Sequence, residues 1–466
     1  MVADFSRLAV HMVGIGGVGM CGVARMLLAE GARVTGSDLA ELSNVRLLRS
    51  LGAHITIGHD AMNVPRDATL VVISAAIRES NPEVAAAKER GLEVVKYSKM
   101  LGRLMGEKRG IAIAGTHGKT TTTAMVTAGL EHCGKSPSYL VGGDLPALGG
   151  SSRAGEGEFF VAEACEYDRS FLNLRPEMAV ITNIDEDHLD YYRDLAEIEE
   201  AFAEFGQLVP RKGLLVTRED DEACKRVAEG VRCRVETFSL AGGGDWTGEV
   251  TGRDGFRSRV VISRSGEEFL EFDLSIPGEH NILNALAAVA VLAGAGISAS
   301  EMKVGLESFR GVRRRFQVLG EVGGVLFVDD YAHHPTEIKA TLGSARSLFR
   351  ERRIWCVFQP HQHSRTRFLL EQFAESFSDA DMLVFPDIYF VRDSEVERRR
   401  ISSADLAREV LARGQEALHI PTFDEIKSSL RRRLQAGDVV ITMGAGNIGE
   451  LGHAMAQEFV EACANG

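Results

Sequence analysis

The chain has 466 residues, of which 45% are hydrophobic and 26% charged, and this size predicts roughly two to four globular domains. Its net charge of −13 argues against a nucleic-acid-binding protein, because phosphate backbones attract Lys and Arg. The seven cysteines form no C-x-x-C pair, which favours reduced thiols and a cytoplasmic protein. We expect neither a signal peptide nor membrane insertion, since no apolar run reaches roughly 18 residues.

The first part of the chain alternates predicted strands and helices. The strands are expected at 8–13, 33–38, 54–58 and 69–77, and the helices end near Gly31 and Gly91. This alternation is typical of a parallel sheet covered by helices, so we predict a Rossmann-like domain over residues 1–107. The segment 100–110 is expected to be a polar joint.

A G-x-G-x-x-G pattern at residues 14–19 follows the first predicted strand, and Asp38 ends the next strand. This arrangement favours a diphosphate ligand, with its pyrophosphate at the helix N-terminus and its ribose at the acid. Both NAD and a UDP conjugate fit the pattern. The same spacing recurs at 444–449, too near the C-terminus for a βαβ unit, and there we predict only a tight turn from strand to helix.

The stretch IAIAGTHGKTTTTAM, which begins at Ile111, is close to a phosphate-binding loop. The usual spacing is G-x-x-x-x-G-K-[ST], but only two residues separate Gly115 from Gly118. Lys119 and Thr120 still supply the charge and the hydroxyl that such a loop needs for phosphate and Mg²⁺. Because the loop lies between a predicted strand and a helix, we predict a nucleotide site with a shortened loop.

Acidic residues follow two later strands of this unit. Glu163 ends the strand 158–164, where its carboxylate would reach a metal held near Thr120. After the strand 178–184, the loop DEDHLD places carboxylates and His188 together, as a second group of metal-binding residues. Residues 242–277 then alternate in short stretches typical of a small antiparallel sheet, and a helix over 281–296 follows.

The last unit again alternates strands and helices. Its strands are expected at 353–359, 381–387 and 438–446. The fold class is therefore α/β with three domains. We predict a central ATPase-type domain over 108–313 that carries the antiparallel strands, and a C-terminal Rossmann-like domain over 314–466.

Six spaced motifs occur in the order seen in the bacterial Mur ligases, and the chain resembles this family over its whole length. They are GTHGKTTTTAM, ITNIDEDHLDYY, GEHNILNALAA, RRRFQVLG, DDYAHHPTE and FQPHQHSRTR. The N-terminal HMVGIGGVGMCGVA looks most like the branch that adds L-alanine to UDP-N-acetylmuramate. The resemblance implies domains that bind the UDP-sugar, ATP and the amino acid, in that order along the chain.

The resemblance also implies catalytic residues. Lys119 would hold the β- and γ-phosphates and Thr120 one Mg²⁺. Glu163 and His188 would hold a second Mg²⁺, and Arg315 would reach phosphate. The other expected ATP contacts are Gly115, Thr116, His117, Gly118, Thr121, His280, Asn281, Asn284, Asp330 and His333. The expected contacts of the UDP-sugar and L-alanine are Gly16, Gly17, Val18, Gly19, Ser37, Asp38, Ser74, Tyr331, His361 and Arg365.

Three features depart from patterns seen in the family. Cys165 stands where Asp is expected, and its neutral thiol cannot act as a carboxylate. Gln362 stands where some members have Arg, which leaves Arg365 as the expected anchor of the alanine carboxylate. The segment between His188 and Lys212 contains no Lys, whereas ligases for the D-glutamate, diaminopimelate and dipeptide steps have a carbamylated Lys there. This absence favours the alanine-adding branch.

The implied reaction activates a carboxylate as an acyl phosphate, which the amine of L-alanine then attacks. We expect a monomer or homodimer that needs ATP and Mg²⁺ and takes part in peptidoglycan synthesis. Three alternatives remain. They are the recycling ligase that attaches a whole tripeptide to the same sugar nucleotide, an NAD-dependent oxidoreductase, and a non-catalytic nucleotide-binding regulator.

Overall fold

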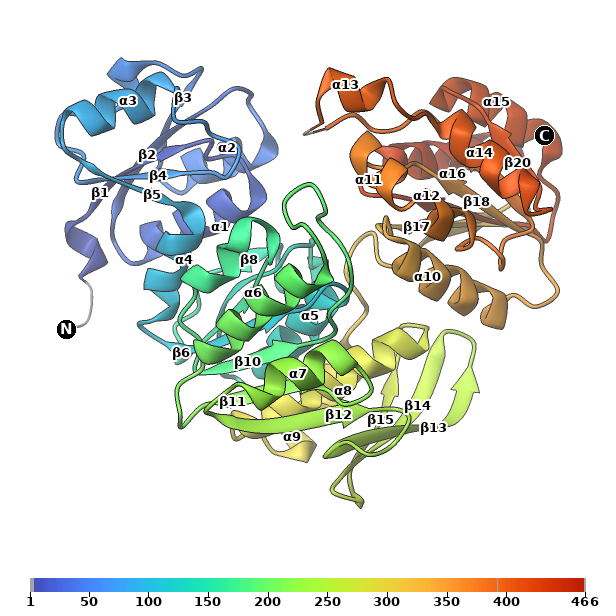
Figure 1. Ribbon diagram of the computed structural model, residues 1–466, viewed down its shortest axis with the longest axis horizontal. Coiled ribbons are helices and arrows are strands. Elements are labelled where there is room, and N and C mark those ends of the chain that lie inside the picture. Colours follow the sequence, from blue (N-terminus) through green and yellow to red (C-terminus); the bar gives the residue numbers. More distant parts are fainter. Residues whose placement is uncertain (1–3, 392, 465–466) are drawn as a thin grey trace.

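The computed structural model describes residues 4–391 and 393–464, which form three α/β units in chain order (Figure 1). The N-terminal and C-terminal units lie side by side in Figure 1, and the central unit lies below them. This three-unit α/β fold confirms the predicted fold class. Among the described residues, no helix is long and apolar enough to cross a membrane.

The N-terminal unit is a parallel sheet with the strand order β3-β2-β1-β4-β5. Its strands are β1 (Ala9–Val13), β2 (Arg33–Asp38), β3 (His54–Ile57), β4 (Leu70–Ile73) and β5 (Glu93–Lys96). Its helices are η1 (Phe5–Arg7), α1 (Val18–Ala29), α2 (Ser43–Ser50), η2 (Ala61–Asn63), α3 (Pro82–Glu89) and α4 (Tyr97–Met105). The strand order reverses at β1, which places the loop at 14–19 at the switch point where such sheets bind ligands.

Helix α4 corrects the expectation of a polar joint at 100–110. Met100, Leu101, Leu104 and Met105 are spaced as on one face of a helix, and all four are buried. They belong to an apolar cluster that also contains Leu174 of the central unit. The segment is therefore helical because it packs two units together.

The central unit is a sheet with the order β15-β14-β13-β12-β11-β10-β6-β9-β7-β8. Its strands are β6 (Arg109–Ala114), β7 (Ser138–Leu140), β8 (Ser152–Arg153), β9 (Phe159–Glu163), β10 (Met178–Ile181), β11 (Leu214–Arg218), β12 (Arg234–Ser239), β13 (Trp246–Asp254), β14 (Arg257–Arg264) and β15 (Glu267–Leu274). Its helices are α5 (Lys119–His132), η3 (Pro146–Leu148), η4 (Tyr167–Asn173), α6 (Leu195–Gln207), α7 (Glu222–Glu229), α8 (Glu279–Gly294) and α9 (Ala299–Ser308). The predicted antiparallel strands are present as β13, β14 and β15, and they continue the edge of this sheet through a parallel pairing with β12.

The C-terminal unit has the strand order β16-β17-β21-β18-β19-β20, and only the pair β16–β17 is antiparallel. Its strands are β16 (Gln317–Val322), β17 (Val325–Asp330), β18 (Ile354–Phe358), β19 (Met382–Phe385), β20 (Ala417–His419) and β21 (Val439–Met443). Its helices are α10 (Pro335–Leu348), α11 (His363–Phe368), α12 (Leu370–Ala374), α13 (Glu395–Arg398), α14 (Ser403–Ala412), α15 (Phe423–Arg433) and α16 (Ile448–Ala464). The second glycine pattern is the turn from β21 into α16, as predicted.

The three units are joined in two different ways. A single cluster of buried apolar side chains runs from Val10 and Leu27 in the N-terminal unit to Phe171 and Phe205 in the central unit. The C-terminal unit has separate apolar clusters on the two faces of its sheet. Its contacts with the central unit include several ion pairs and hydrogen bonds, which lie around the candidate site.

Candidate active site

The shortened phosphate loop connects β6 to α5. Gly115 and Gly118 both have positive φ, at 132° and 82°, which favours glycine. A Cβ atom on Gly115 would lie 1.9 Å from Thr182 Oγ1, and one on Gly118 would lie 2.3 Å from Asn284 Oδ1. Both positions therefore exclude side chains because other elements approach the loop closely.

Two residues after β10 hold the loop in place. Asn183 accepts a hydrogen bond from the His117 backbone amide through Oδ1 at 2.9 Å and donates to the His117 carbonyl at 3.0 Å. Thr182 also donates to that carbonyl, at 2.5 Å. Sequence analysis assigned no role to these two residues, although they follow a strand at its carboxyl end, where ligand-binding residues gather in α/β sheets.

Lys119 lies in the first turn of α5 with its ammonium surrounded by oxygen atoms. Nζ donates to the carbonyls of Gly115 and Thr116 at 2.6 and 2.9 Å, and to Glu166 Oε1 at 3.0 Å. Burial lowers the pKa of Lys119, but the nearby carboxylates outweigh burial and the pKa is raised, so the amine stays charged. The Lys119 ammonium thus places a positive charge against the carbonyls of the phosphate loop.

The predicted metal-binding residues lie together beside Lys119. The Thr120 hydroxyl donates to Glu163 Oε2 at 2.9 Å, and the backbone amide of Gly142 donates to the same oxygen at 2.8 Å. His188 lies in the same cavity, with a backbone φ of 55° that is uncommon outside glycine. Hydroxyl and carboxylate oxygens are ligands that Mg²⁺ prefers, so the donor set fits this ion.

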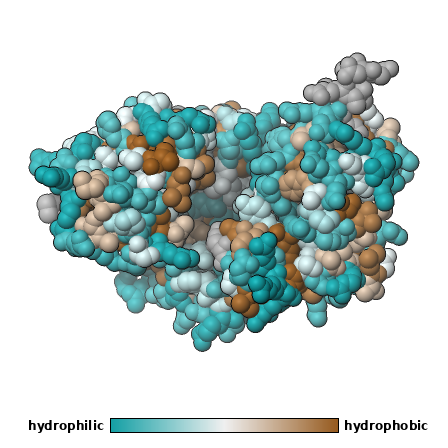
Figure 2. Space-filling model, turned by 90° about the horizontal axis from the view of Figure 1, so that it is seen from above, coloured by the Kyte–Doolittle hydropathy of each residue, from teal (hydrophilic) through white to brown (hydrophobic). Residues whose placement is uncertain are grey.

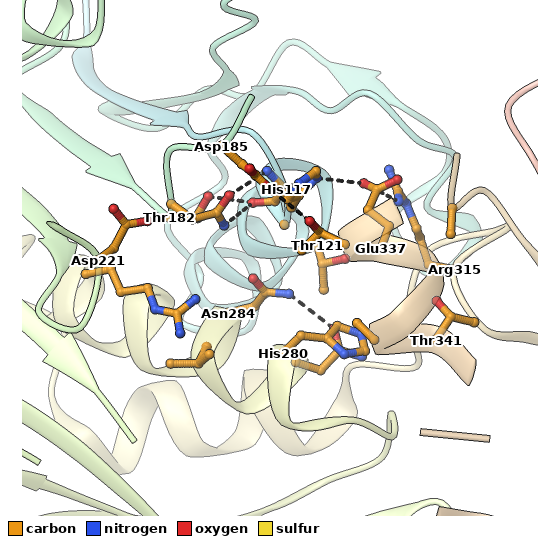
Figure 3. Close-up of a pocket in the computed structure, with 18 of the residues that line it drawn as sticks. His117, Thr121, Thr182, Asp185, Asp221, His280, Asn284, Arg315, Glu337 and Thr341 are labelled. Carbon is orange, nitrogen blue, oxygen red and sulfur yellow. Dashed lines mark hydrogen bonds and ion pairs between the residues drawn. The ribbon is translucent and has the colours of Figure 1, made fainter. Parts of the chain in front are cut away.

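A pocket of about 260 Å³ opens on one side of the loop, between the central and C-terminal units (Figure 3). Its lining combines apolar and polar groups, as in nucleotide sites. The predicted residues that line it are His117, Gly118, Thr121, His280, Asn281, Asn284, Arg315 and Asp330. Burial and the neighbouring Arg315 lower the pKa of His280 to about 4, so this imidazole is neutral at pH 7.

A second cavity, of about 530 Å³, lies on the other side of the loop. The predicted residues that line it are Thr116, Gly118, Lys119, Thr120, Glu163, His188, Arg315, Tyr331 and His333. Gly118, Arg315 and Glu337 line both cavities, so the two spaces meet at the end of the phosphate loop. This arrangement suits a nucleoside on one side and reacting phosphates on the other.

The C-terminal unit supplies several charged groups to this junction. The Arg315 guanidinium lies 3.7 Å from Glu337 Oε1 and over the ring of Tyr331, 5.1 Å from its centroid. Asp330 accepts hydrogen bonds from the backbone amides of Phe316 and Ala332, and burial raises its pKa to about 6. Glu337 was not predicted, although its place in the first turn of α10, after the HHP sequence, was a signal for it.

His117 connects the central and C-terminal units directly. Its Nε2 lies 3.3 Å from Asp185 and its Nδ1 lies 3.4 Å from Glu337 (Figure 3). Burial lowers the pKa of His117, but these two carboxylates outweigh burial and raise the pKa to about 9. The imidazole is therefore protonated at pH 7 and bridges carboxylates from two units.

Arg365 also crosses this boundary. It is buried, and both its Nε and its Nη2 donate to Asp187 Oδ1, at 3.2 and 2.9 Å. His361 lies outside the two cavities and stacks on Tyr389 with a ring separation of 5.6 Å. The structure thus brings Arg365 to the loop of His188, where Asp187, predicted only as one of a group of metal-binding residues, holds it.

The first glycine loop lines neither of the two cavities. The backbone amide of Gly16 donates to Asp38 Oδ2 at 2.8 Å, so the acid expected at a ribose binds the loop itself. Ser37 is completely buried and its hydroxyl donates to Glu83, so this side chain is held within the N-terminal unit. Gly17 and Val18 are exposed. Seen from above, the molecule is hollowed between its N-terminal and C-terminal units (Figure 2).

Comparison with known proteins gives matches along the whole chain. Three family models match: "Mur ligase family, catalytic domain" over residues 9–109, "Mur ligase middle domain" over 113–292, and "Mur ligase, glutamate ligase domain" over 314–446. The UDP-N-acetylmuramate–L-alanine ligase of Caldanaerobacter subterraneus subsp. tengcongensis is 43% identical, over 96% of this chain and 97% of that protein.

Solved structures give the same result. The UDP-N-acetylmuramate-alanine ligase MurC of Thermotoga maritima superposes with a TM-score of 0.80 at 30% identity, over 98% of this chain and 100% of its own. A murein peptide ligase of Psychrobacter arcticus gives a TM-score of 0.72 at 25% identity, over 97% and 99%. The chain belongs to the Mur ligase family.

Proposed function

We propose that the protein is an ATP-dependent ligase that joins L-alanine to the carboxylate of UDP-N-acetylmuramate, with release of ADP and phosphate. The reaction is a step in peptidoglycan precursor synthesis. The observation that carries the proposal is the nearly full-length match, at 43% identity, to a UDP-N-acetylmuramate–L-alanine ligase. The two cavities that meet at the phosphate loop support it, because they separate a nucleoside pocket from a charged reaction space.

Each unit has its own ligand in this proposal. Residues 1–107 bind the UDP-sugar at the loop of Gly16–Gly19 and Asp38, residues 108–313 bind ATP, and residues 314–466 bring the amino acid. The strand reversal at β1 supports the first assignment, because ligands bind at such switch points. The position of Arg365 beside the His188 loop supports the last one.

The chemistry requires two anions to meet. A carboxylate oxygen of the sugar attacks the γ-phosphorus while the bond to ADP breaks, and this gives an acyl phosphate. The neutral amine of L-alanine then attacks the carbonyl carbon, phosphate leaves with the electron pair of the C–O bond, and the amine loses a proton. Lys119 and Arg315 line the cavity where this charge gathers, and they would stabilise it.

We propose Mg²⁺ as the cation of this site, where Thr120 would hold one ion and Glu163 and His188 would hold a second. When bound, the ion would neutralise phosphate charge and polarise the transferred group. The 2.9 Å separation of Thr120 Oγ1 and Glu163 Oε2 supports this assignment.

The protein works in the cytoplasm in this proposal, where ATP and sugar nucleotides are available, and it acts as a monomer or homodimer. One chain supplies every group assigned above. A recycling ligase that attaches a tripeptide is the second candidate, supported by the murein peptide ligase structure. The lower identity of that match, 25% against 43%, favours L-alanine.

Phosphate release tests the proposal. The purified protein should release phosphate from ATP only when UDP-N-acetylmuramate and L-alanine are both present, and the tripeptide should not replace L-alanine. Lys119→Ala should lower this rate by about 100-fold or more, because a buried charge at the transferred phosphate is lost. Release that requires the tripeptide would contradict the choice of amino acid, and release without the sugar nucleotide would contradict the reaction.

A further inference from the structure

Three side chains of the kinds that bind metals converge from two units beside the nucleoside pocket. His117 and Asp185 belong to the central unit, and His334 belongs to the C-terminal unit. One nitrogen of each imidazole and one carboxylate oxygen of Asp185 all lie within 4.8 Å of one another. This group is separate from Thr120 and Glu163, which line the other cavity. His334 has no role in the proposed function.

Each imidazole presents one nitrogen to Asp185 and is held by an acceptor at the other nitrogen. His334 Nε2 donates to the Glu186 carbonyl at 3.0 Å. The lone pair of this ring is therefore on Nδ1, which lies 4.0 Å from Asp185 Oδ2. His117 Nδ1 faces Glu337 Oε1 at 3.4 Å, and its Nε2 lies 3.3 Å from the same Asp185 oxygen. Histidines that bind metals are typically held in this way, because an acceptor on one nitrogen directs the other nitrogen toward the ion.

The present partners of these atoms leave them available to a cation. Nδ1 of His334 accepts from the Thr336 amide at 3.3 Å, which is long for a hydrogen bond. Burial and the neighbouring His117 lower the pKa of His334, so no proton occupies that lone pair at pH 7. Burial raises the pKa of Asp185, but hydrogen bonds from His117 and Thr336 outweigh burial and lower it, so the carboxylate is ionised.

We propose that His117, Asp185 and His334 bind a Zn²⁺ ion that fastens the C-terminal unit to the central unit. Imidazole nitrogens and a carboxylate are typical ligands of Zn²⁺, whereas Mg²⁺ prefers oxygen ligands. The ion displaces the proton from Nε2 of His117, since metal binding and protonation compete for the same lone pair. His117 and Asp185 line the nucleoside pocket, which gives the ion a route to the site. The inference does not depend on the proposed function.

Zinc binding to the full-length protein tests this inference. Zn²⁺ is titrated against a chromophoric chelator without nucleotide and in excess Mg²⁺, which occupies oxygen-rich sites. The wild type should compete with the chelator for Zn²⁺, and His334→Asn should bind the ion about 100-fold more weakly, since loss of even an outer partner of a ligand costs about 10- to 100-fold. Asn keeps a side-chain acceptor for the first turn of α10. His419→Asn, which removes an imidazole paired with Asp387 in the same unit, should bind like the wild type.

A second variant and a second readout guard against a folding defect. Asp185→Asn removes the anionic ligand with little change of shape, and it should also weaken Zn²⁺ binding. Zn²⁺ should raise the melting temperature of the wild type and leave that of His334→Asn unchanged, because the ion binds only the assembled units. Wild-type affinity for Zn²⁺ in either variant would overturn the inference, and so would a wild type whose melting temperature does not respond to Zn²⁺. None of these measurements uses the sugar nucleotide or L-alanine, so their outcome is independent of the proposed ligation.

Discussion

Arg365 shows how a residue predicted to bind a substrate also connects two units of the fold. Sequence analysis expected its guanidinium to hold the alanine carboxylate. In the structure, Nε and Nη2 both donate to Asp187, a carboxylate whose pKa is held well below its usual range despite burial. The guanidinium lines a small pocket beside the loop of His188.

Arg365→Lys should raise the KM for L-alanine about tenfold or more, because Lys cannot contact Asp187 and a second carboxylate with one planar fork. Asp187→Asn should raise the same KM, since it releases the guanidinium from its position. If Asp187 acts through Arg365, the double variant should be no worse than Arg365→Lys alone. Steady-state kinetics in L-alanine provide the measurement. An unchanged KM in Arg365→Lys would place the carboxylate anchor elsewhere.

The residues of the phosphate loop could be placed from the sequence because the pattern that positions them is local. Lys119 and Thr120 follow a glycine loop between a strand and a helix, so their neighbourhood is determined by nearby residues. The ion pairs of Glu166, Asp187 and Glu337 were not predicted, because their partners come from other elements or from another unit. A carboxylate in a loop gives no local sign that it becomes buried against a distant charge.

At the scale of elements, the first glycine loop packs against its own strands and helices. A Cβ atom on Gly16 would lie 2.9 Å from Asp38 Oδ2 and 3.1 Å from a methyl of Val45. A Cβ atom on Gly17 would approach only the Gly14 carbonyl, at 3.7 Å, and Gly17 is exposed. Neighbouring glycines in one loop therefore differ in what a side chain would disturb.

Gly17→Val should weaken binding of UDP-N-acetylmuramate about tenfold while the melting temperature stays near that of the wild type, because its side chain points away from the fold. Gly16→Val should lower the melting temperature, since it displaces Asp38 from the loop amide. Calorimetric titration and thermal unfolding of the full-length protein measure both effects. Wild-type affinity in Gly17→Val would show that the sugar nucleotide does not approach this loop, and binding of NAD instead would identify a different ligand.

Strands and turns were predictable here because their patterns are local, but helix α4 was not. In the sequence, its apolar residues alternate with glycines and charged residues and do not indicate a helix. They are buried only because the central unit packs against them. The central sheet likewise continues into β13 through a parallel pairing with β12. No turn sequence predicts this pairing.

At the scale of the whole molecule, the two boundaries between units differ in chemistry. The N-terminal and central units share one apolar cluster, so we expect them to move as one body. The C-terminal unit meets the central unit through Arg365–Asp187, the bridge of His117 to Glu337, and a hydrogen bond from Thr336 to Asp185 at 2.7 Å. Phe256 of the central unit adds a smaller apolar contact with Phe316 and Phe349. Polar contacts between units are sensitive to pH and salt, whereas buried apolar surface is not.

His117 makes this boundary sensitive to alkaline pH. Its ordinary pKa of 6.5 is raised to about 9, so the stabilisation is fully present below pH 6.5 and is lost as the pH rises through about 9. The groups that face it are Asp185 and Glu337, which are ionised, and His334, whose pKa is lowered chiefly by burial, so that the ring is neutral at pH 7. A shift of this size corresponds to at most about 3 kcal/mol.

We therefore expect the melting temperature of the wild type to exceed that of His117→Gln at pH 7, and this difference to shrink steadily between pH 8 and pH 10. Groups that both proteins share, such as Lys and Tyr, cancel in the difference. Small-angle X-ray scattering should show the wild type becoming less compact over the same range, because the bridge between the central and C-terminal units loses its charge. A difference that stays constant from pH 7 to pH 10 would mean that the proton on His117 does not hold the two units together, and the pair of Arg365 with Asp187 would then be the contact to test.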